Sequence, residues 1–397
     1  MTNLVYPDGK SVRYAFDRAN RMTRVTDWLG NTTVYGYDPT GNLLLSTNSN
    51  GTFARHQYDN ASRRVNLIDG KADGGVIAAY RLAMDATGNR TNVTVVAALP
   101  TALTSTNVIA TYDADNRILT ATGSLISHDA NGNLTGILGP KPTTFEYDFF
   151  DRLTRVSFTN YIVQHQYDSM GNRIMRTVNG TATKYVVQPR RLSQLLMETD
   201  AAGNPTAYYV YGLGLVSKVT PGNQIYFYHY DALGSTVAIT DSFGSTVNKY
   251  AYDPFGSKLA NSVETIANPF AFVGQKGIAD EGNGLFHMRA RYYFPSIGRF
   301  INRDPIGLFG GLNAYVYARN NPVKFFDPSG LQVSNPNRCS ENPMPQIQDP
   351  SNHPSQPWCG EVCDEILCNK YPWLPVCTTP SGQMPEQPHT HEEPLEF

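Results

Sequence analysis

The sequence YDPTGN at Tyr37–Asn42 decides the fold, because related segments recur along most of the chain. The same pattern is an aromatic residue, Asp, two variable residues and then Gly or Asn. It stands as YDSMGN at Tyr167–Asn172 and as YDPFG at Tyr252–Gly256. Less regular copies are centred on Asp17, Asp59, Asp85, Asp113, Asp129, Asp148, Asp200 and Asp231. A repeat this frequent predicts a repetitive architecture.

Each copy has the chemistry of a hairpin turn. The Asp carboxylate is expected to accept hydrogen bonds from backbone amides two or three residues further on. The Gly or Asn three places later accepts the left-handed conformation that closes a short β loop. Beside the turns the residues alternate, as in TVYGY at Thr33–Tyr37 and RLTRVSF at Arg152–Phe158. Such alternation is typical of β-strands.

The spacing of the copies predicts how the strands are organised. Asp17, Asp38 and Asp59 follow one another at 21 residues, and Asp148 and Asp168 at 20. This distance accommodates two strands of about seven residues with their turns. A propeller blade needs roughly twice this length, and leucine-rich repeats have a different apolar pattern. We therefore predict an all-β fold of stacked antiparallel hairpins in a long, curling sheet.

The composition agrees with β structure, with 24 Tyr, 33 Gly and only 17% charged residues. The longest apolar segment, Val93–Leu103, is interrupted by Thr and Pro and is too short to span a bilayer. No basic segment leads into an apolar core near Met1, so no classical signal peptide is visible. Because Tyr6–Gly9 already belongs to the repeat, we expect the chain to be the end of a longer array.

The region after Leu331 differs in kind. It contains all five Cys and 12 of the 26 Pro, and residues 332–397 carry a net charge of −7 against +5 for the rest. Neither part is basic enough to indicate nucleic-acid binding.

Between these parts, Gly284–Leu331 reads GLFHMRARYYFPSIGRFINRDPIGLFGGLNAYVYARNNPVKFFDPSGL. This segment resembles the core that closes rearrangement hotspot (RHS) and YD-repeat proteins, and the upstream aromatic-Asp repeats resemble the same family. The resemblance implies that residues 1–283 form a β shell, residues 284–331 plug one end of it, and residues 332–397 are a variable toxin tail. Phe294 departs from the family pattern, which usually has Asp in RYYDP; we expect this change to weaken a local turn.

Two Asp-Pro-x-Gly motifs are the catalytic candidates. Asp304 and Asp327 lie 23 residues apart, each on a rigid Pro turn. If the fold brings them within about 3 Å, both cannot ionise and one proton is shared. The charged member can then activate water while the other polarises a peptide carbonyl, as in aspartic peptidases. The resemblance implies this dyad, supported by Arg291 and cutting its own chain between Leu331 and Gln332.

A structural interpretation stands beside the catalytic one. Asp-Pro-x-Gly is a good turn in any β protein. Three other arginines, Arg289, Arg299 and Arg303, compete with Arg291, whose assignment depends mainly on the resemblance. The Tyr residues of the repeats are expected to stabilise the sheet as cross-strand pairs, with carbohydrate stacking as the alternative.

The tail leaves its own alternatives open. Its cysteines predict two disulfides and one odd thiol, in keeping with an oxidising destination. Zinc binding with His389 and His391 is the other interpretation, although no C-x2-C pair is present, and we predict no metal or other cofactor. The five cysteines are Cys339, Cys359, Cys363, Cys368 and Cys377.

Two functions follow from these features. The first is an RHS-type polymorphic toxin, secreted or at the cell surface, with a self-cleaving core that releases the tail. The resemblance then implies an immunity protein and a delivery machinery as partners. The second is a non-enzymatic β shell or a surface adhesion module that binds carbohydrate, a truncated remnant whose array is too short to enclose a toxin.

Overall fold

A computed structural model describes residues 2–334, except 87, 98, 100–107, 190 and 191. The five cysteines and the two tail histidines lie outside the described residues, so their pairing and metal binding stay predictions. Within the described part, no helix is long and apolar enough to cross a membrane.

The described chain is built from three antiparallel sheets, and within each sheet every strand pairs with the next one along the sequence. This confirms the predicted all-β array of stacked hairpins. The first sheet has nine strands: β1 (Asn3–Val5), β2 (Ser11–Phe16), β3 (Met22–Thr26), β4 (Thr32–Tyr37), β5 (Leu43–Asn48), β6 (Thr52–Tyr58), β7 (Arg64–Lys71), β8 (Val76–Met84) and β9 (Arg90–Val96).

The second sheet continues the same pattern over sixteen strands. They are β10 (Ala110–Tyr112), β11 (Ile118–Ala121), β12 (Ser124–His128), β13 (Leu134–Leu138), β14 (Thr143–Tyr147), β15 (Leu153–Phe158), β16 (Tyr161–Tyr167), β17 (Arg173–Val178), β18 (Thr181–Gln188), β19 (Gln194–Thr199), β20 (Pro205–Tyr211), β21 (Leu215–Val219), β22 (Ile225–Tyr230), β23 (Thr236–Thr240), β24 (Thr246–Lys249) and β25 (Val263–Glu264).

A small third sheet and four short 3-10 helices follow. The sheet contains β26 (Ala279–Asp280), β27 (Phe286–Met288), β28 (Arg291–Phe294) and β29 (Arg299–Phe300). The 3-10 helices are η1 (Gly274–Lys276), η2 (Pro295–Ile297), η3 (Gly307–Phe309) and η4 (Ala318–Asn320). We call residues 279–331 the core segment.

The repeat motif closes the hairpins through its Asp. In the copy at Tyr37–Asn42, Asp38 Oδ1 accepts the amide of Asn42 at 2.8 Å, and Asp38 Oδ2 accepts the Asn42 side chain at 2.9 Å. Gly41 has a φ of 95°, the left-handed region that favours glycine. The motif therefore makes a hairpin turn as predicted. The carboxylate accepts the amides two and four residues further on, as at Asp17 and Asp168, rather than two or three, because the amide three residues on bonds the backbone carbonyl of the Asp, as at Asp38.

In several copies the tyrosine of the motif ties its hairpin to the previous one. Tyr37 donates its hydroxyl hydrogen to the carbonyl of Met22 at 2.7 Å, and Tyr167 does the same to Leu153 at 2.6 Å. Tyr230 donates to Leu215 at 2.7 Å. These phenols thus satisfy their polar ends within the sheet while their rings are covered, which supports the structural interpretation of the repeat tyrosines.

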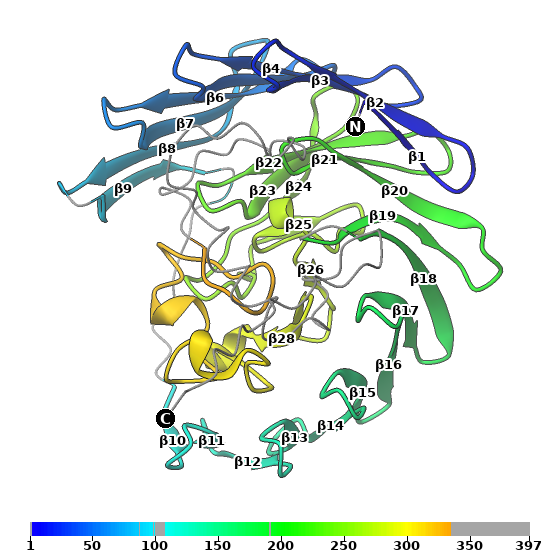
Figure 1. The fold of residues 1–397 in the computed structure, drawn as a ribbon, viewed down its shortest axis with the longest axis vertical. Coiled ribbons are helices and arrows are strands. Elements are labelled where there is room, and N and C mark those ends of the chain that lie inside the picture. The colour runs from blue at the N-terminus through cyan, green and yellow to red at the C-terminus, as the bar shows by residue number, and fades with distance from the viewer. Residues whose placement is uncertain (1, 87, 98, 100–107, 190–191, 335–397) are drawn as a thin grey trace, which may run out of the picture.

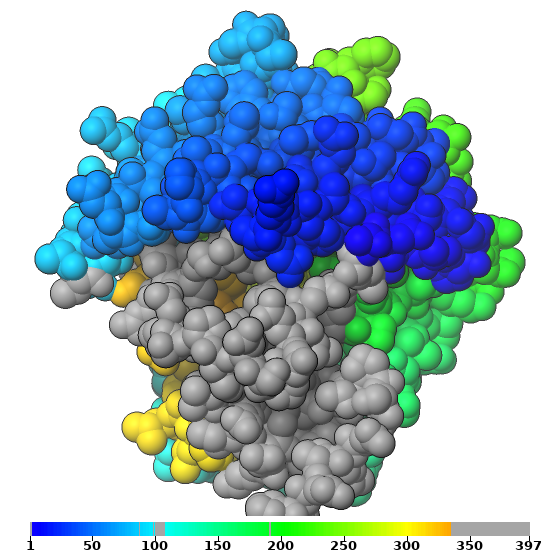
Figure 2. Space-filling model, turned by 45° about the horizontal axis from the view of Figure 1, so that its top comes forward, coloured from blue at the N-terminus to red at the C-terminus, as the bar shows by residue number. Residues whose placement is uncertain are grey.

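The two large sheets face each other at one end of the molecule, where the nine-stranded sheet covers β19–β24 (Figure 1). Figure 2 shows the nine-stranded sheet as a continuous outer face. Tyr6 donates a hydrogen bond to the carbonyl of Tyr209 across this contact at 2.7 Å, and the Tyr6, Trp28 and Tyr208 rings meet edge to face. Aromatic rings thus pack there together with aliphatic side chains such as Val12 and Leu215.

The core segment lies on the concave side of the sixteen-stranded sheet (Figure 1). Tyr292 and Ile301 pack with β11–β16 residues such as Val156 and Val163. A separate apolar cluster within the core segment includes Tyr293, Phe300 and Tyr317. The sheet therefore supplies one wall against which the core segment folds.

Candidate active site

One strand and two loops of the core segment bring the predicted site residues together. Arg291 begins β28, Asp304 lies between β29 and η3, and Asp327 follows η4. Each carboxylate closes a local turn, because Asp304 Oδ1 accepts the amide of Ile306 at 3.1 Å and Asp327 Oδ1 accepts the amide of Leu331 at 3.2 Å. The Asp-Pro-x-Gly motifs thus serve as turns, and their Oδ2 atoms are left for other contacts.

One guanidinium nitrogen contacts both carboxylates. Arg291 Nη2 lies 2.9 Å from Asp304 Oδ2 and 3.4 Å from Asp327 Oδ2. The side chains are only 2%, 5% and 2% exposed for Arg291, Asp304 and Asp327. The guanidinium carbon also lies 3.6 Å from the centre of the Phe300 ring, which favours a cation there. The structure thus brings the three predicted residues together, with the arginine in contact with both carboxylates; their catalytic role stays a prediction.

Arg291 is also bonded to the backbone on both sides of the site. Its Nη1 donates to the carbonyl of Ala314 at 3.0 Å, and its Nε donates to the carbonyl of Gly330. Gly330 has a φ of 69°, and a Cβ atom there would lie 2.9 Å from the backbone nitrogen of Arg291. Glycine is thus required for the turn to approach β28 this closely.

Asp327 lies beside the predicted scissile bond. Its Oδ1 accepts the Ser329 hydroxyl at 2.9 Å and the amide of Gln332 at 3.2 Å, in addition to the Leu331 amide. The amide nitrogen of Gln332 would become the leaving amine if the Leu331–Gln332 bond were cut. A carboxylate is therefore within one hydrogen bond of that bond.

Burial dominates the electrostatics of the site. It raises the pKa of Asp304 to about 6, although Arg291 and the Ile306 amide oppose this and Asp327 adds to it. Burial also raises the pKa of Asp327 against the opposing effects of Arg291, Ser329 and the two amides. The pKa of Arg291 is lowered by burial despite both carboxylates. Burial of all three side chains therefore disfavours the state in which Arg291, Asp304 and Asp327 are all charged.

The competing arginines have other partners. Arg289 has a positive φ of 55° and donates to the carbonyls of Ser193, Lys276 and Pro328. Arg299 donates to the carbonyl of Asn116 at 2.9 Å, and its guanidinium lies over the ring of Tyr112. Both of these partners are far along the chain from Asp304 and Asp327. The aliphatic part of Arg303 lies near Gly132. The structure thus brings Arg291 to both carboxylates.

Phe294, the departure from the family motif, ends β28 and precedes Pro295 of η2. It packs at the edge of the apolar cluster that joins the core segment to β11–β16. No side chain caps η2, so the turn lacks the carboxylate contact that an Asp could make. This position contributes packing in the present chain.

Sequence reasoning missed two contributors. Ser329 could have been noticed as the variable residue of the second Asp-Pro-x-Gly motif, next to a carboxylate it can reach. Phe300 had no such signal, because its contact with Arg291 depends on how β28 and β29 pair.

Comparison with known proteins shows which families the sequence matches. A family model described as the teneurin YD-shell matches residues 57–326, and one described as the RHS repeat matches residues 1–32. The tRNA3(Ser)-specific nuclease WapA of Bacillus spizizenii is 36% identical over 277 residues, which are 67% of this chain and 11% of that protein.

Other relatives are named as toxins. Double-stranded DNA deaminase toxin A of Burkholderia cenocepacia is 30% identical over 338 residues, 76% of this chain and 22% of that protein. Toxin protein Tse5 of Pseudomonas aeruginosa is 25% identical over 361 residues, 81% of this chain and 27% of that protein. The chain thus spans roughly a tenth to a quarter of the length of these relatives.

Solved structures share the fold. TcdB2-TccC3-TEV matches with a TM-score of 0.55 at 18% identity, covering 82% of this chain and 22% of that chain. TcdB2-TccC3 without its hypervariable C-terminal region matches with a TM-score of 0.54, with the same identity and coverage. With a family model that matches more than half of its length and a shell fold shared with these structures, the chain belongs to the teneurin YD-shell family.

Proposed function

We propose that this chain is the C-terminal part of an RHS-type toxin whose core segment cuts its own backbone between Leu331 and Gln332 and so releases residues 332–397. The observation that carries the proposal is the buried cluster in which Arg291 contacts Asp304 and Asp327 next to that bond. The toxin names of several relatives support the wider assignment.

The charges of the cluster favour one proton on the dyad. Counting only Arg291, Asp304 and Asp327, the net charge is −1 with both carboxylates ionised and zero with one protonated; Arg289 also interacts with Asp327. Because burial disfavours charge, the form with one proton is preferred below the pKa of Asp304, about 6. The proton belongs to the coupled pair, and the three donors on Asp327 favour ionisation of that member.

The proposed reaction uses this protonation state. Asp327 accepts a proton from a water molecule that attacks the Leu331 carbonyl carbon, and Asp304 donates its proton to the carbonyl oxygen. Collapse of the tetrahedral diol breaks the bond to Gln332, whose nitrogen takes a proton from Asp327 while Asp304 takes back one hydroxyl proton. The products are an amine at Gln332 and a carboxylic acid at Leu331, which ionises by losing its proton to solvent, and Arg291 stabilises the negative charge throughout.

The test is the mass of the purified full-length protein. We expect fragments of 331 and 66 residues, with the cut mapped to Leu331–Gln332, since acid cleavage of an Asp-Pro bond would instead map to Asp327–Pro328. Asp304→Asn and Asp327→Asn should each slow cleavage by roughly 10²- to 10⁴-fold, and Arg291→Ala should slow it as well.

The matched control is Asp253→Asn, which alters an Asp-Pro-x-Gly turn in the repeats. It should leave cleavage unchanged. Cleavage at the wild-type rate in either dyad variant would reduce both motifs to turns.

A non-enzymatic β shell or adhesion module is the second candidate. It is favoured by the fact that Asp304 and Asp327 each close a turn, so that a structural role accounts for their Oδ1 contacts. An intact chain at neutral and mildly acidic pH, with the native fold shown by cooperative unfolding, would establish this alternative. The proposal that the chain is part of a toxin also includes its secretion, an immunity protein and a delivery machinery.

A further inference from the structure

Two histidines lie where the core segment meets the sixteen-stranded sheet. His165 belongs to β16 of that sheet, and His287 belongs to β27 of the core segment. Both rings pack against the ring of Tyr292 in β28, with centre-to-centre distances of 5.2 Å for His165 and 5.1 Å for His287. The three rings are therefore part of the contact through which the core segment docks on the concave side of the sheet (Figure 1).

These histidines lack hydrogen-bond partners that buried polar groups usually have. His165 is only 4% exposed, and neither of its ring nitrogens has a partner among the described residues. The Nε2 atom of His287 is also buried without a partner in the described part of the chain. A protonated imidazole has an N–H donor on both nitrogens and a full charge, so it loses more on burial than the neutral ring does. The contact therefore favours neutral histidines.

Arginines of the neighbouring strand oppose a positive charge on His165. Arg176 is its direct partner in the β16–β17 ladder, and Arg173 belongs to the same strand β17. Burial, followed by these two arginines, lowers the pKa of His165 well below its ordinary value. Glu281 already pairs with both arginines, and Glu198 of β19 also interacts with both. These negative charges are thus engaged before His165 takes up a proton.

The surroundings of His287 act in the same direction. Burial lowers its pKa well below the ordinary value, and Arg173, the other histidine and Arg289 add to this effect against a backbone hydrogen bond at Arg289. Tyr292 and Tyr167, whose hydroxyl oxygens lie 3.2 Å apart, have raised pKa values and stay neutral. No phenolate is therefore available to match a positive charge on these rings.

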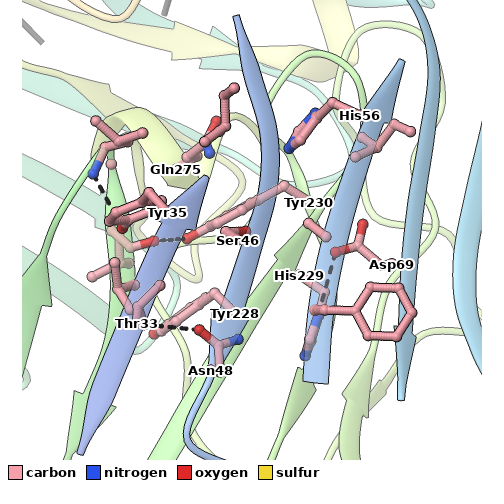
Figure 3. A pocket seen from close by; sticks show the side chains of 18 of the residues that line it. Thr33, Tyr35, Ser46, Asn48, His56, Asp69, Tyr228, His229, Tyr230 and Gln275 are labelled. Carbon is pink, nitrogen blue, oxygen red and sulfur yellow. Dashed lines mark hydrogen bonds and ion pairs between the residues drawn. The ribbon is translucent and has the colours of Figure 1, made fainter. Parts of the chain in front are cut away.

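His229 has the opposite arrangement at the contact between the two large sheets (Figure 3). Its Nδ1 atom lies 3.5 Å from Asp69 Oδ1, and its Nε2 atom lies 2.9 Å from Thr240 Oγ1. Each ring nitrogen of His229 thus has a polar neighbour, and one of these neighbours is a carboxyl group. A proton on His229 has a partner of opposite charge within reach, whereas a proton on His165 has none.

We propose that the core segment docks stably on β16 and β17 only while His165 and His287 are neutral, and that their protonation at acidic pH releases it from the sheet. Histidines titrate near pH 6.5 when the contact is open and at lower pH when it is closed. The docking free energy is therefore fully present above pH 6.5 and is lost as the pH falls below it. Each histidine can raise the opening constant by up to about tenfold per pH unit in that range.

The dyad titrates in the opposite direction, because burial raises the pKa of Asp304 and of Asp327. The test therefore uses the full-length chain with Asp304→Asn and Asp327→Asn as the parent. These substitutions remove the opposing titration. They also remove the proposed cleavage chemistry, so the result does not depend on whether the chain cuts itself.

Hydrogen–deuterium exchange of the β27 and β28 amides measures the opening of the contact. After correction for the intrinsic pH dependence of exchange, we expect the opening constant of the parent to be at least about tenfold larger at pH 5 than at pH 8. Adding His165→Gln and His287→Gln should remove most of this increase. His229→Gln is the matched control and should retain it. Equal opening at both pH values in the parent, or the same increase without the two histidines, would overturn the proposal.

A second measurement needs no substitution of the histidines. Exchange of the imidazole C2 hydrogen, followed by mass spectrometry, reports the pKa of each histidine in the folded parent chain. His165 and His287 should both titrate below 6.5. A pKa at or above 6.5 for both rings would contradict the proposal even if the histidine variants failed to fold.

Discussion

The chemistry proposed for the core segment depends on one arginine in contact with two buried carboxylates. A carboxylate beside an arginine usually has a lowered pKa, yet burial outweighs Arg291 at Asp304 and raises the pKa to about 6. The guanidinium can neutralise only one of the two charges. Burial therefore favours protonation of one carboxyl group of the cluster, with the pKa of Asp304 at about 6.

The rate of self-cleavage should depend on pH accordingly. Because protonated Asp304 is the proposed acid, we expect the rate to fall about tenfold per pH unit above pH 6. The measurement is the appearance of the 66-residue fragment after rapid dilution from denaturant into buffers from pH 5 to 8. A rate that is constant over this range would exclude Asp304 as the acid.

The titration of Asp304 should also affect the free energy of unfolding. Since the pKa of Asp304 in the folded chain exceeds its ordinary value of 3.8, the folded state retains a proton that the unfolded chain loses. The contribution of this group is therefore fully present below pH 3.8 and is lost as pH rises through about 6. Burial raises the pKa of Asp327 as well, so the comparison removes both carboxyl groups: urea unfolding should show this loss in uncleaved Asp327→Asn and not in the double variant Asp304→Asn/Asp327→Asn. Identical pH dependence in both variants would contradict it.

At this scale the sequence predicted the members of the site through its motifs. Asp304 and Asp327 are visible as Asp-Pro-x-Gly turns, and Arg291 was favoured over its neighbours by resemblance. The choice between Arg289 and Arg291 could not be derived from spacing. It depends on the β27–β28 hairpin, whose turn at Arg289 directs one guanidinium to backbone carbonyls and the other to the dyad.

The hairpin is the repeating element, and its turn chemistry is local. This explains why the strands and turns could be predicted from six-residue motifs, whereas the hydrogen bond from each Tyr hydroxyl to the preceding hairpin could not. That bond joins residues about fifteen positions apart, as in Tyr37 and Met22. The contact between the two sheets is less predictable still, since Tyr6 and Tyr209 are separated by 203 positions.

Removing the Asp of one turn should destabilise its hairpin. Asp38→Ala loses hydrogen bonds from the Asn42 amide and side chain and from the Thr40 hydroxyl. By analogy with helix caps we expect a loss of about 1–2 kcal/mol in the free energy of unfolding. Thr40→Ala, which removes only the exposed hydroxyl, is the control and should cost less. Equal losses would mean that the carboxylate contributes nothing beyond that contact.

In the whole molecule, a buried ion cluster joins the core segment to the shell. Glu281, just after β26, pairs through Oε1 with Arg173 and through Oε2 with Arg176 at 3.0 Å. Arg173 also donates to Tyr292 of β28 at 3.3 Å. Burial disfavours the charged form of Arg173, but the negative charge of Glu281 outweighs this effect and raises the pKa of Arg173. Both arginines belong to β17, so the cluster fixes how the core segment docks on the sixteen-stranded sheet.

Breaking this cluster should loosen the core segment from the shell. Glu281→Gln leaves Arg173 buried without a counter-charge, for which we expect a loss of about 3–5 kcal/mol in the free energy of unfolding. Glu146→Gln, which removes the exposed pair with Arg155, should cost no more than about 1 kcal/mol. Adding Arg173→Met to Glu281→Gln should restore part of the loss, because the unpaired charge is then removed as well.

Urea unfolding measures the stability of all three variants, and limited proteolysis should cut the core segment of Glu281→Gln faster than that of the wild type. If Glu281→Gln were as stable and as resistant as Glu146→Gln, the docking of the core segment would depend on its apolar contacts with β11–β16 instead.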